Sequence, residues 1–233
     1  PHARLMRAVA PGSGDTVAVK VLASQGVGTG RDALARFVRE AEALAKLRHP
    51  NVVPLHDFIE AGPAMVLAWM PGGSLRDLLD REPFSPARAA EIARGVLDAL
   101  AEAHRLGILH RDVKPSNLLF DGGGTARLAD FGAAHLASSQ ATVTVGAIGT
   151  VAYMAPEQRE GRAATVTSDL FAVGVLLHEM LTRRLPSGDP GEIRLSLEHP
   201  DLSPAHDALL ARFLEPQPGD RFASALEARQ AVE

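Results

Sequence analysis

Three side chains that could serve phosphoryl transfer lie close together in one short stretch. Residues 110–117 read His-Arg-Asp-Val-Lys-Pro-Ser-Asn and contain Asp112, Lys114 and Asn117. A carboxylate can orient an attacking hydroxyl, a cation can balance the charge of the moving phosphoryl group, and an amide oxygen is a hard ligand for Mg²⁺. An ordinary polar turn is the alternative, because short motifs also match by chance. The stretch predicts a phosphoryl-transfer site if the rest of the chain supplies its partners.

The residues before position 70 predict a small antiparallel sheet. Its strands are expected at 4–10, 16–22, 52–59 and 64–70, with turn residues between them. In the second strand, a period of two places Ala18 and Lys20 on the same face. A lysine on an edge strand that points to solvent is the alternative explanation of Lys20.

A helix is predicted over 31–47, because apolar residues recur there at helical spacing. Those residues are Leu34, Phe37, Val38, Ala41, Leu44 and Ala45. Glu40 falls inside this apolar stripe, whereas Glu42 is expected in solvent. A buried carboxylate without a partner is costly, so Glu40 is expected to need a cation.

The second half of the chain predicts helices around the 110–117 stretch. Ser74 and Ser85 are suitable N-caps for a short helix to Arg81 and for a long helix that begins at Pro86 and stops at Gly107. The run 168–181 is apolar nearly all round and predicts a buried helix. Asp169 at its start would need partners, while His178 and Glu179 are expected on its surface.

A hairpin is predicted from 118–120 and 126–129, with the glycine-rich turn 121–124 between them. This hairpin would return the chain from Asn117 to Asp130. Two oxygen ligands for a metal ion would then lie close together.

These motifs resemble those of the protein kinase family. The 110–117 stretch is similar to the kinase catalytic loop H-R-D-L-x-x-x-N, with valine in place of leucine, and V-A-V-K at 17–20 is similar to V-A-I-K. Residues 130–132 are D-F-G and residues 155–157 are A-P-E. The sequence style, including G-T-x-x-Y-M-A-P-E-Q from Gly149, resembles bacterial eukaryotic-like (Hanks-type) Ser/Thr protein kinases, and the resemblance covers essentially the whole chain.

The resemblance implies an α+β, two-lobed protein-kinase-like fold over residues 1–233. A small antiparallel β N-lobe is expected at 1–70, and a hinge with a mainly α-helical C-lobe at 71–233. The first strand and most of the Gly-rich loop G-x-G-x-x-G-x-V are expected to be missing, because Leu5 matches the final valine and the first two glycines would precede Pro1. The chain is therefore expected to be a segment of a longer protein or a processed product.

The glycines at 26–30 do not replace that loop. They follow the lysine strand and enter the 31–47 helix, so they are interpreted as a flexible linker.

The resemblance also implies an ATP-dependent Ser/Thr protein kinase that transfers the γ-phosphoryl group of ATP to protein hydroxyls. ATP and Mg²⁺ are the expected cofactors, with Mn²⁺ as an alternative metal. Asp112, Lys114 and Asn117 would be catalytic, and Asn117 and Asp130 would hold the metal. Lys20 would contact the nucleotide phosphates with Glu40 as its partner. The other nucleotide contacts would be Ala18 over adenine, Leu67 at the back pocket, and the backbone of Ala68 and Met70.

Regulatory and structural roles follow from the same resemblance. Arg111 would pair with a phosphothreonine in the activation segment, at Thr144 or at Thr142, after autophosphorylation. Thr150 would lie near Lys114 and the substrate hydroxyl. Among the structural residues, Asp169 would hold the catalytic-loop backbone, and Arg221 would pair with Glu157. A purely polar surface role is the alternative for the loop threonines.

Composition restricts the partners. The net charge of −4 and the pI near 6.2 argue against a nucleic-acid partner. The lack of cysteine excludes disulfides and fits a reducing, cytoplasmic location. No apolar run is long enough for a membrane span, so no membrane contact is expected within this segment, and a tether outside it is left open. The nine histidines show no metal-binding spacing. The expected partners are ATP and protein substrates, and a homodimer could serve autophosphorylation.

Two other functions remain open at this point. A pseudokinase that acts as a binding scaffold is favoured only by the incomplete Gly-rich loop. A small-molecule phosphotransferase of related fold is disfavoured by A-P-E and by Gly149-Thr150. The span 183–204 is shorter than the corresponding part of the family, where a helix helps to dock protein substrates.

Overall fold

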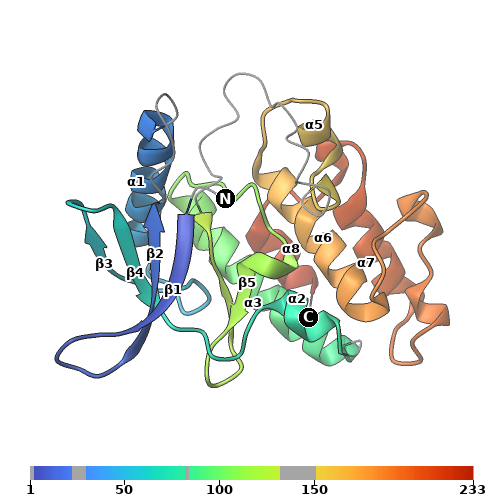
Figure 1. Ribbon diagram of the computed structural model, residues 1–233. Coiled ribbons are helices and arrows are strands. Elements are labelled where there is room, and N and C mark those ends of the chain that lie inside the picture. The colour runs from blue at the N-terminus through green and yellow to red at the C-terminus, as the bar shows by residue number, and fades with distance from the viewer. Residues whose placement is uncertain (1–2, 23–29, 82–83, 132–150, 233) are drawn as a thin grey trace.

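The computed structural model describes residues 3–22, 30–81, 84–131 and 151–232, and the side chains of 30–32 and 36 are not described. Figure 1 shows two parts, a twisted sheet with one helix beside it and a larger group of helices. The predicted α+β, two-lobed arrangement is confirmed. The helices of the described residues include none that is long and apolar enough to cross a membrane.

The sheet contains four antiparallel strands in the order β1-β2-β4-β3. The strands are β1 (Ala3–Val9), β2 (Thr16–Leu22), β3 (Leu55–Ile59) and β4 (Ala64–Ala68). β2 lies between β1 and β4, with Lys20 opposite Leu5 on one side and Met65 on the other. Lys20 is therefore not on an edge strand.

The strand predicted from position 52 begins later, at Leu55. Pro54 has no N–H to donate to a ladder, so the chain cannot continue the β3 pairing through it. Val52 instead forms an isolated parallel bridge with Leu128, and the N–H of Val53 donates to the Leu128 carbonyl at 3.0 Å. This connection joins the sheet part of the molecule to the helical part.

Helix α1 (Gly30–Lys46) packs on the sheet. Its buried side includes Phe37, Ala41 and Leu44, and the rings of Phe37 and Phe58 of β3 lie 6.1 Å apart. Leu34 and Ala45, predicted on the same stripe, are exposed. Ala43 and Leu47 are buried as well, so the buried face is turned relative to the stripe that the sequence pattern indicates.

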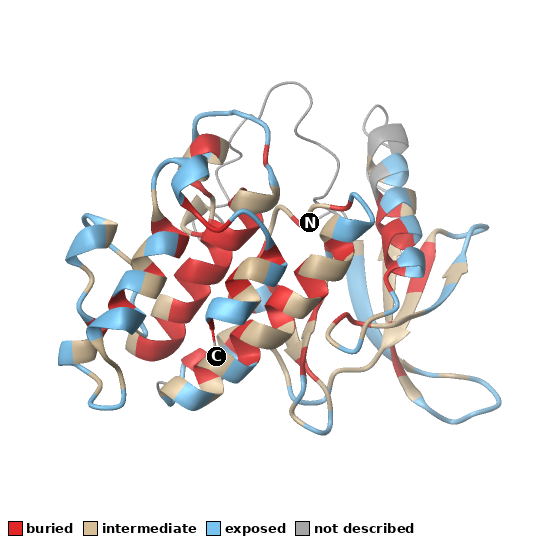
Figure 2. Cartoon of the chain, turned by 180° about the vertical axis from the view of Figure 1, so that it is seen from behind, coloured by how far each residue is buried: buried red, intermediate tan, exposed pale blue. Residues whose placement is uncertain are grey.

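The larger part is built on six helices within the described residues: α2 (Leu75–Leu79), α3 (Pro86–Arg105), α5 (Pro156–Arg159), α6 (Val166–Thr182), α7 (Pro204–Leu214) and α8 (Ala225–Ala231). α6 contacts α3, α7 and α8, and Figure 2 shows it buried along most of its length. In the span 183–204 that follows α6, the chain forms two 3₁₀ turns, η3 (Pro190–Glu192) and η4 (Leu195–Leu197). A further turn, η5 (Pro218–Asp220), precedes α8.

The predicted helix starts are explained by their caps. Ser74 forms a capping box with Asp77 at the start of α2, and Ser85 accepts a hydrogen bond from the N–H of Arg88 at the start of α3. α3 ends before Gly107, whose φ of +72° favours glycine. α2 ends at Leu79, two residues before the predicted end.

The hairpin of β5 (Leu118–Phe120) and β6 (Ala126–Leu128) lies between the two parts. It follows η1 (Pro115–Asn117), and Leu118, Phe120 and Leu128 are buried in the common core. The hairpin thus fixes the ends of the segments that carry Asn117 and Asp130.

Candidate active site

Lys20, Glu40 and Asp130 meet between the sheet and the hairpin. Lys20 Nζ lies 2.6 Å from Glu40 Oε1 and 2.9 Å from Asp130 Oδ1. The side chain of Glu40 is 6% exposed, whereas that of Asp130 is 46% exposed. One ammonium group is thus shared by a buried carboxylate from α1 and an exposed one from the end of the hairpin.

The pKa values of the two carboxyl groups that share Lys20 move in opposite directions. Burial and the nearby charge of Asp130 raise the pKa of Glu40 to about 7, although Lys20 opposes the rise. Burial acts to raise the pKa of Asp130 as well, but the charge and hydrogen bond of Lys20, with smaller contributions from Glu40 and His110, together hold that pKa below its ordinary value. Burial lowers the pKa of Lys20, and the two carboxylates together more than reverse this. Asp130 is therefore the carboxylate that stays ionised and can exchange Lys20 for another cation.

The predicted nucleotide contacts lie on β2, on β4 and just after β4. Ala18 is buried and stands opposite Leu67 in the sheet register. Leu67, Ala68 and Met70 are half-buried, and the Ala68 N–H donates to the Pro54 carbonyl at 3.0 Å. A small side chain at position 18 leaves room for a flat ligand beside Lys20.

The catalytic-loop residues form a second cluster. Lys114 Nζ lies 2.7 Å from Asp112 Oδ2. Asn117 Nδ2 donates to the Asp112 carbonyl at 2.8 Å and to Asp112 Oδ2 at 3.0 Å. These two hydrogen bonds orient the amide group so that Asn117 Oδ1 can coordinate a cation. The Ala129 N–H donates to the Asn117 carbonyl at 2.8 Å, which brings Asn117 next to the residue before Asp130.

Asp169 holds the backbone of this loop. The N–H groups of His110 and Arg111 donate to its two carboxylate oxygens at 2.9 and 2.7 Å, and His104 Nε2 lies 2.8 Å from Oδ2. Asp169 is 1% exposed, so these bonds form away from water. They support a left-handed backbone at Arg111, where φ is +65°. Such a conformation is costly for a side-chain-bearing residue and persists only where its surroundings hold it.

His110 connects the loop to the segment before Asp130. Its Nδ1 accepts from the Asp112 N–H at 3.3 Å, so its Nε2 is the nitrogen that donates to the Ala129 carbonyl at 2.9 Å. The ring also packs against Phe131, at a centroid distance of 4.6 Å. Asp130 itself has φ of +63°. One buried imidazole therefore links the residue after Arg111 to the residue before Asp130, and both Arg111 and Asp130 have a left-handed backbone.

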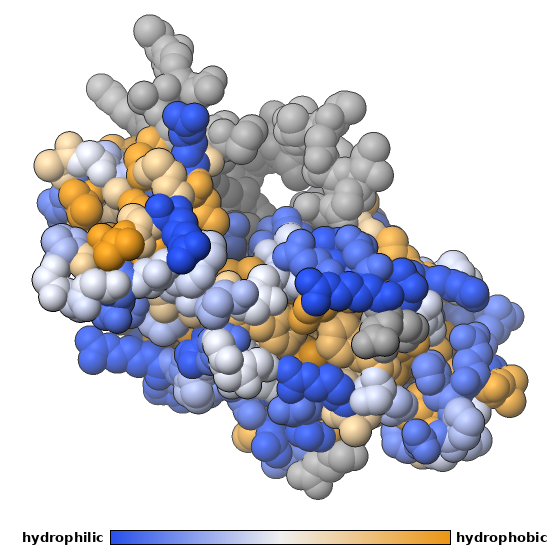
Figure 3. Space-filling model, turned by 60° about the horizontal axis from the view of Figure 1, so that its bottom comes forward, coloured by the Kyte–Doolittle hydropathy of each residue, from blue (hydrophilic) through white to orange (hydrophobic). Residues whose placement is uncertain are grey.

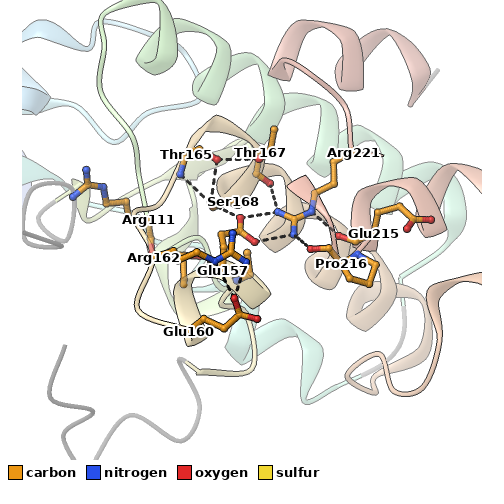
Figure 4. A network of polar contacts seen from close by, with 12 residues as sticks. Arg111, Glu157, Glu160, Arg162, Thr165, Thr167, Ser168, Glu215, Pro216 and Arg221 are labelled. Atoms are coloured by element: carbon orange, nitrogen blue, oxygen red, sulfur yellow. Dashed lines mark hydrogen bonds and ion pairs between the residues drawn. The ribbon is translucent and has the colours of Figure 1, made fainter. Parts of the chain in front are cut away.

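Glu157 and Arg221 form a buried ion pair that fixes the end of the 151–159 segment (Figure 4). The guanidinium donates to both carboxylate oxygens, at 2.8 and 2.9 Å, and the Ser168 hydroxyl donates to Oε1 at 2.6 Å. Burial alone would raise the pKa of Glu157, but the bonds from Arg221 and Ser168 lower it to about 2. The remaining donors of Arg221 reach backbone carbonyls of Glu215, Pro216 and Thr167.

The expectation that Glu179 lies on a helix surface was wrong. Glu179 is 5% exposed and accepts hydrogen bonds from the Tyr153 hydroxyl at 2.5 Å and from Arg76 Nη1 at 2.9 Å. Arg76 Nη2 also donates to the Tyr153 oxygen at 2.6 Å. Burial and the Glu179 carboxylate raise the pKa of the Tyr153 hydroxyl, which keeps it a neutral donor. The residues on both sides of Glu179 in α6 are mostly apolar and buried, and this pattern was a signal in the sequence that Glu179 lies among buried neighbours.

The regulatory threonines Thr142, Thr144 and Thr150 lie outside the described residues. So do residues 26–29 of the glycine-rich stretch, and Gly30 begins α1. Arg111 is described and half-buried, and the carbonyl of Arg111 accepts from Gln158 Nε2 at 3.4 Å. Its Nε has no hydrogen-bond partner within the described part of the chain.

Comparisons with known proteins point to one family. The model described as "Protein kinase domain" matches residues 2–231. The chain is similar to the serine/threonine-protein kinase PkaA of Streptomyces coelicolor, with 37% identity over 229 residues, 92% of this chain and 42% of the relative. It is also similar to the serine/threonine-protein kinase PknL of Mycobacterium tuberculosis, with 36% identity over 226 residues, 90% of this chain and 56% of the relative. The chain thus spans about half the length of these two relatives.

Proposed function

Because the chain belongs to the protein kinase family, we propose that it transfers the γ-phosphoryl group of ATP to serine and threonine hydroxyls of proteins. The observation that carries the proposal is the way the hairpin joins the two clusters. Lys20, Glu40 and Asp130 form one cluster, and Asp112 and its neighbours form the other. The first cluster is proposed to bind the nucleotide, and the second is proposed to bind the acceptor hydroxyl.

Family membership implies a divalent metal ion, and we assign Mg²⁺. The described residues contain no group of three or more His, Cys, Asp or Glu side chains that could hold a metal by themselves. Mg²⁺ does not require such a cage, because it usually takes one or two protein oxygens and completes its shell with phosphate and water. Asn117 Oδ1 and Asp130 fit that requirement. When bound, the ion would neutralise charge on the nucleotide phosphates.

The side chains have separate tasks in the proposed mechanism. Asp112 orients the acceptor hydroxyl and takes its proton, and Lys114, 2.7 Å away, balances the charge that develops beside it. Lys20 would contact the nucleotide phosphates, and Glu40, 2.6 Å from Lys20 Nζ, would keep Lys20 in place when Asp130 holds the metal. Lys114 favours serine and threonine hydroxyls as the acceptors, because the loop that contains it resembles the catalytic loop of Ser/Thr kinases.

The test is turnover of Asp112→Asn with labelled ATP, Mg²⁺ and a generic protein substrate. Loss of the positioned base should lower kcat by roughly 10²- to 10⁴-fold, while ATP affinity stays within about twofold. Asp98→Asn, at a half-buried position on α3 that pairs with Arg229 at 3.2 Å, is the control and should retain turnover. Normal turnover in Asp112→Asn would refute the assignment, and no turnover in the unchanged chain would favour the scaffold function.

Activation by autophosphorylation is part of the proposal. A phosphate on Thr144, or on Thr142, would pair with Arg111, whose carbonyl and N–H are already fixed by Gln158 and Asp169. Arg111→Gln should then lower turnover about as much as Thr144→Val. Mass spectrometry of an active preparation with no phosphate on either threonine would exclude this activation.

A further inference from the structure

A pocket of about 480 Å³ opens in the helical part of the molecule, away from both clusters. It lies between the start of α3, the end of α6, and α7, and none of its lining residues belongs to the nucleotide or acceptor site. Its apolar walls include Ala90, Leu177, Leu181, Leu202, Leu209 and Val232. Figure 3, which brings the underside of the molecule forward, shows apolar side chains gathered on the helical part with hydrophilic ones around them.

The walls are preformed. Leu177, Leu181 and Val232 belong to the buried core, with exposures of 7%, 8% and 4%. A pocket of this volume is within the range of roughly 300–1,000 Å³ for small-molecule sites, which are mostly apolar with a few polar groups. Water in an apolar pocket finds few hydrogen-bond partners, so an apolar chain that replaces it gains free energy.

One arginine, Arg94, is among the residues that line the pocket. Pro86, Ala90 and Arg94 are spaced by four residues and lie along one stripe of α3, and Val232, which lines the same pocket, directly follows α8. Arg94 is half-buried, and within the described residues its guanidinium makes one hydrogen bond, from Nη1 to the Val232 carbonyl at 3.1 Å. A guanidinium has five donors, so most of this group can still bind an anion.

The other polar groups that line the pocket do not interfere with anion binding at Arg94. Ser85 is the N-cap of α3 and accepts from the Arg88 N–H. His206 is exposed, and its Nδ1 accepts from the Ser203 N–H at 2.9 Å. Among the lining residues that the structure describes, Asp201 is the only carboxylate, and it is exposed, so solvent screens its charge. The charge pattern therefore favours a ligand with an anionic group at Arg94 and an apolar group in the rest of the pocket.

We propose that this pocket binds a single-chain fatty acid, with its alkyl chain among the leucines of α6 and α7 and its carboxylate on Arg94. The proposal is independent of the kinase activity, because the two sites share no residue. A fatty acid satisfies both features at once, whereas a neutral apolar ligand would leave the Arg94 donors unused.

Calorimetric titration with saturated fatty acids from octanoate to palmitate, each below its micelle concentration, tests the apolar part. Each added CH₂ should lower Kd by about fourfold until the pocket is full. At a ligand concentration of about a hundred times Kd, Tm should rise by roughly 5–10 °C. A Kd that does not change with chain length, or no binding at all, would overturn the proposal.

Two variants test the placement. Ala90→Phe should fill the pocket and abolish binding, and Arg94→Gln should weaken fatty-acid binding by roughly 10- to 100-fold. Arg94→Gln should leave the matching fatty alcohols unaffected, and this comparison stands even if Ala90→Phe does not fold. Arg105→Gln, an exposed change on the same helix, should bind as the unchanged protein does. Equal weakening of acids and alcohols by Arg94→Gln would overturn the headgroup assignment.

Discussion

Replacing Glu157 by glutamine should show how strongly one buried ion pair supports the fold. Glutamine keeps the shape of the side chain but removes the charge that faces Arg221 at 2.8 Å. The pKa of Glu157 lies at about 2 instead of 4.5. This difference of about 2.5 pKa units corresponds to about 3 kcal/mol between its charged and protonated forms. Glu157→Gln should therefore lower the free energy of unfolding by about 3 kcal/mol at neutral pH, in the range for breaking a buried pair.

The pH dependence gives a sharper assay. A carboxyl whose folded pKa is depressed contributes stability above its unfolded pKa and loses it as the pH falls toward the folded value. Urea unfolding should give a constant difference between the unchanged chain and Glu157→Gln above about pH 5, and a shrinking difference toward pH 2. The raised pKa of Glu40 affects both proteins equally, so it cancels from this difference.

The matched control is Glu160→Gln. Glu160 also pairs with an arginine, Arg162, at 2.7 Å, but the two side chains are 61% and 54% exposed. A surface pair contributes about 0–1 kcal/mol, so this variant should unfold almost as the unchanged chain does. A loss below about 1 kcal/mol for Glu157→Gln, or a difference that stays constant down to pH 3, would refute the reasoning.

Two further substitutions test the site and its support. Asp130→Ala should abolish Mg²⁺-dependent ATP binding, since it removes the exposed carboxylate at Lys20, and calorimetry that shows unchanged affinity would contradict the metal assignment. Glu179→Gln should lower the free energy of unfolding by about 3 kcal/mol, because Tyr153 and Arg76 lose a buried charged acceptor. Urea unfolding measures this loss, and a change below about 0.5 kcal/mol would show that the cluster tolerates a neutral acceptor.

Local signals in the sequence predicted the elements that carry the site. The period of two in 16–22 gives β2, and the serine caps give the starts of α2 and α3. The position of Glu40 in an apolar stripe indicated a buried carboxylate in need of a cation, and the structure places Lys20 there. The periodicity and the caps depend on residues within one or two turns of each other, so a linear sequence contains them, whereas the pairing of Lys20 with Glu40, 20 positions apart, was predicted from the family resemblance.

The partners of distant residues could not be predicted in the same way. Arg76 and Tyr153 are 77 positions apart, and Tyr153 and Glu179 are 26 positions apart. A hydrophobic pattern shows which face of an element is buried, but not which polar group meets it from another element. His104 illustrates the same limit, because its bond to Asp169 depends on how α3 packs against α6.

Burial separates two groups of residues, three that support the site and the two aspartates proposed to act in it. Asp169, Glu157 and Arg221 are 1–2% exposed, and their bonds fix backbone or each other. The side chains of Asp112 and Asp130 are 16% and 46% exposed. A fully desolvated bond is costly to break, so it suits a permanent support, whereas an exposed carboxylate can exchange one cation or proton for another. Substitutions in the first group should therefore lower stability first and turnover as a consequence. Those in the second group should lower turnover while the chain stays folded.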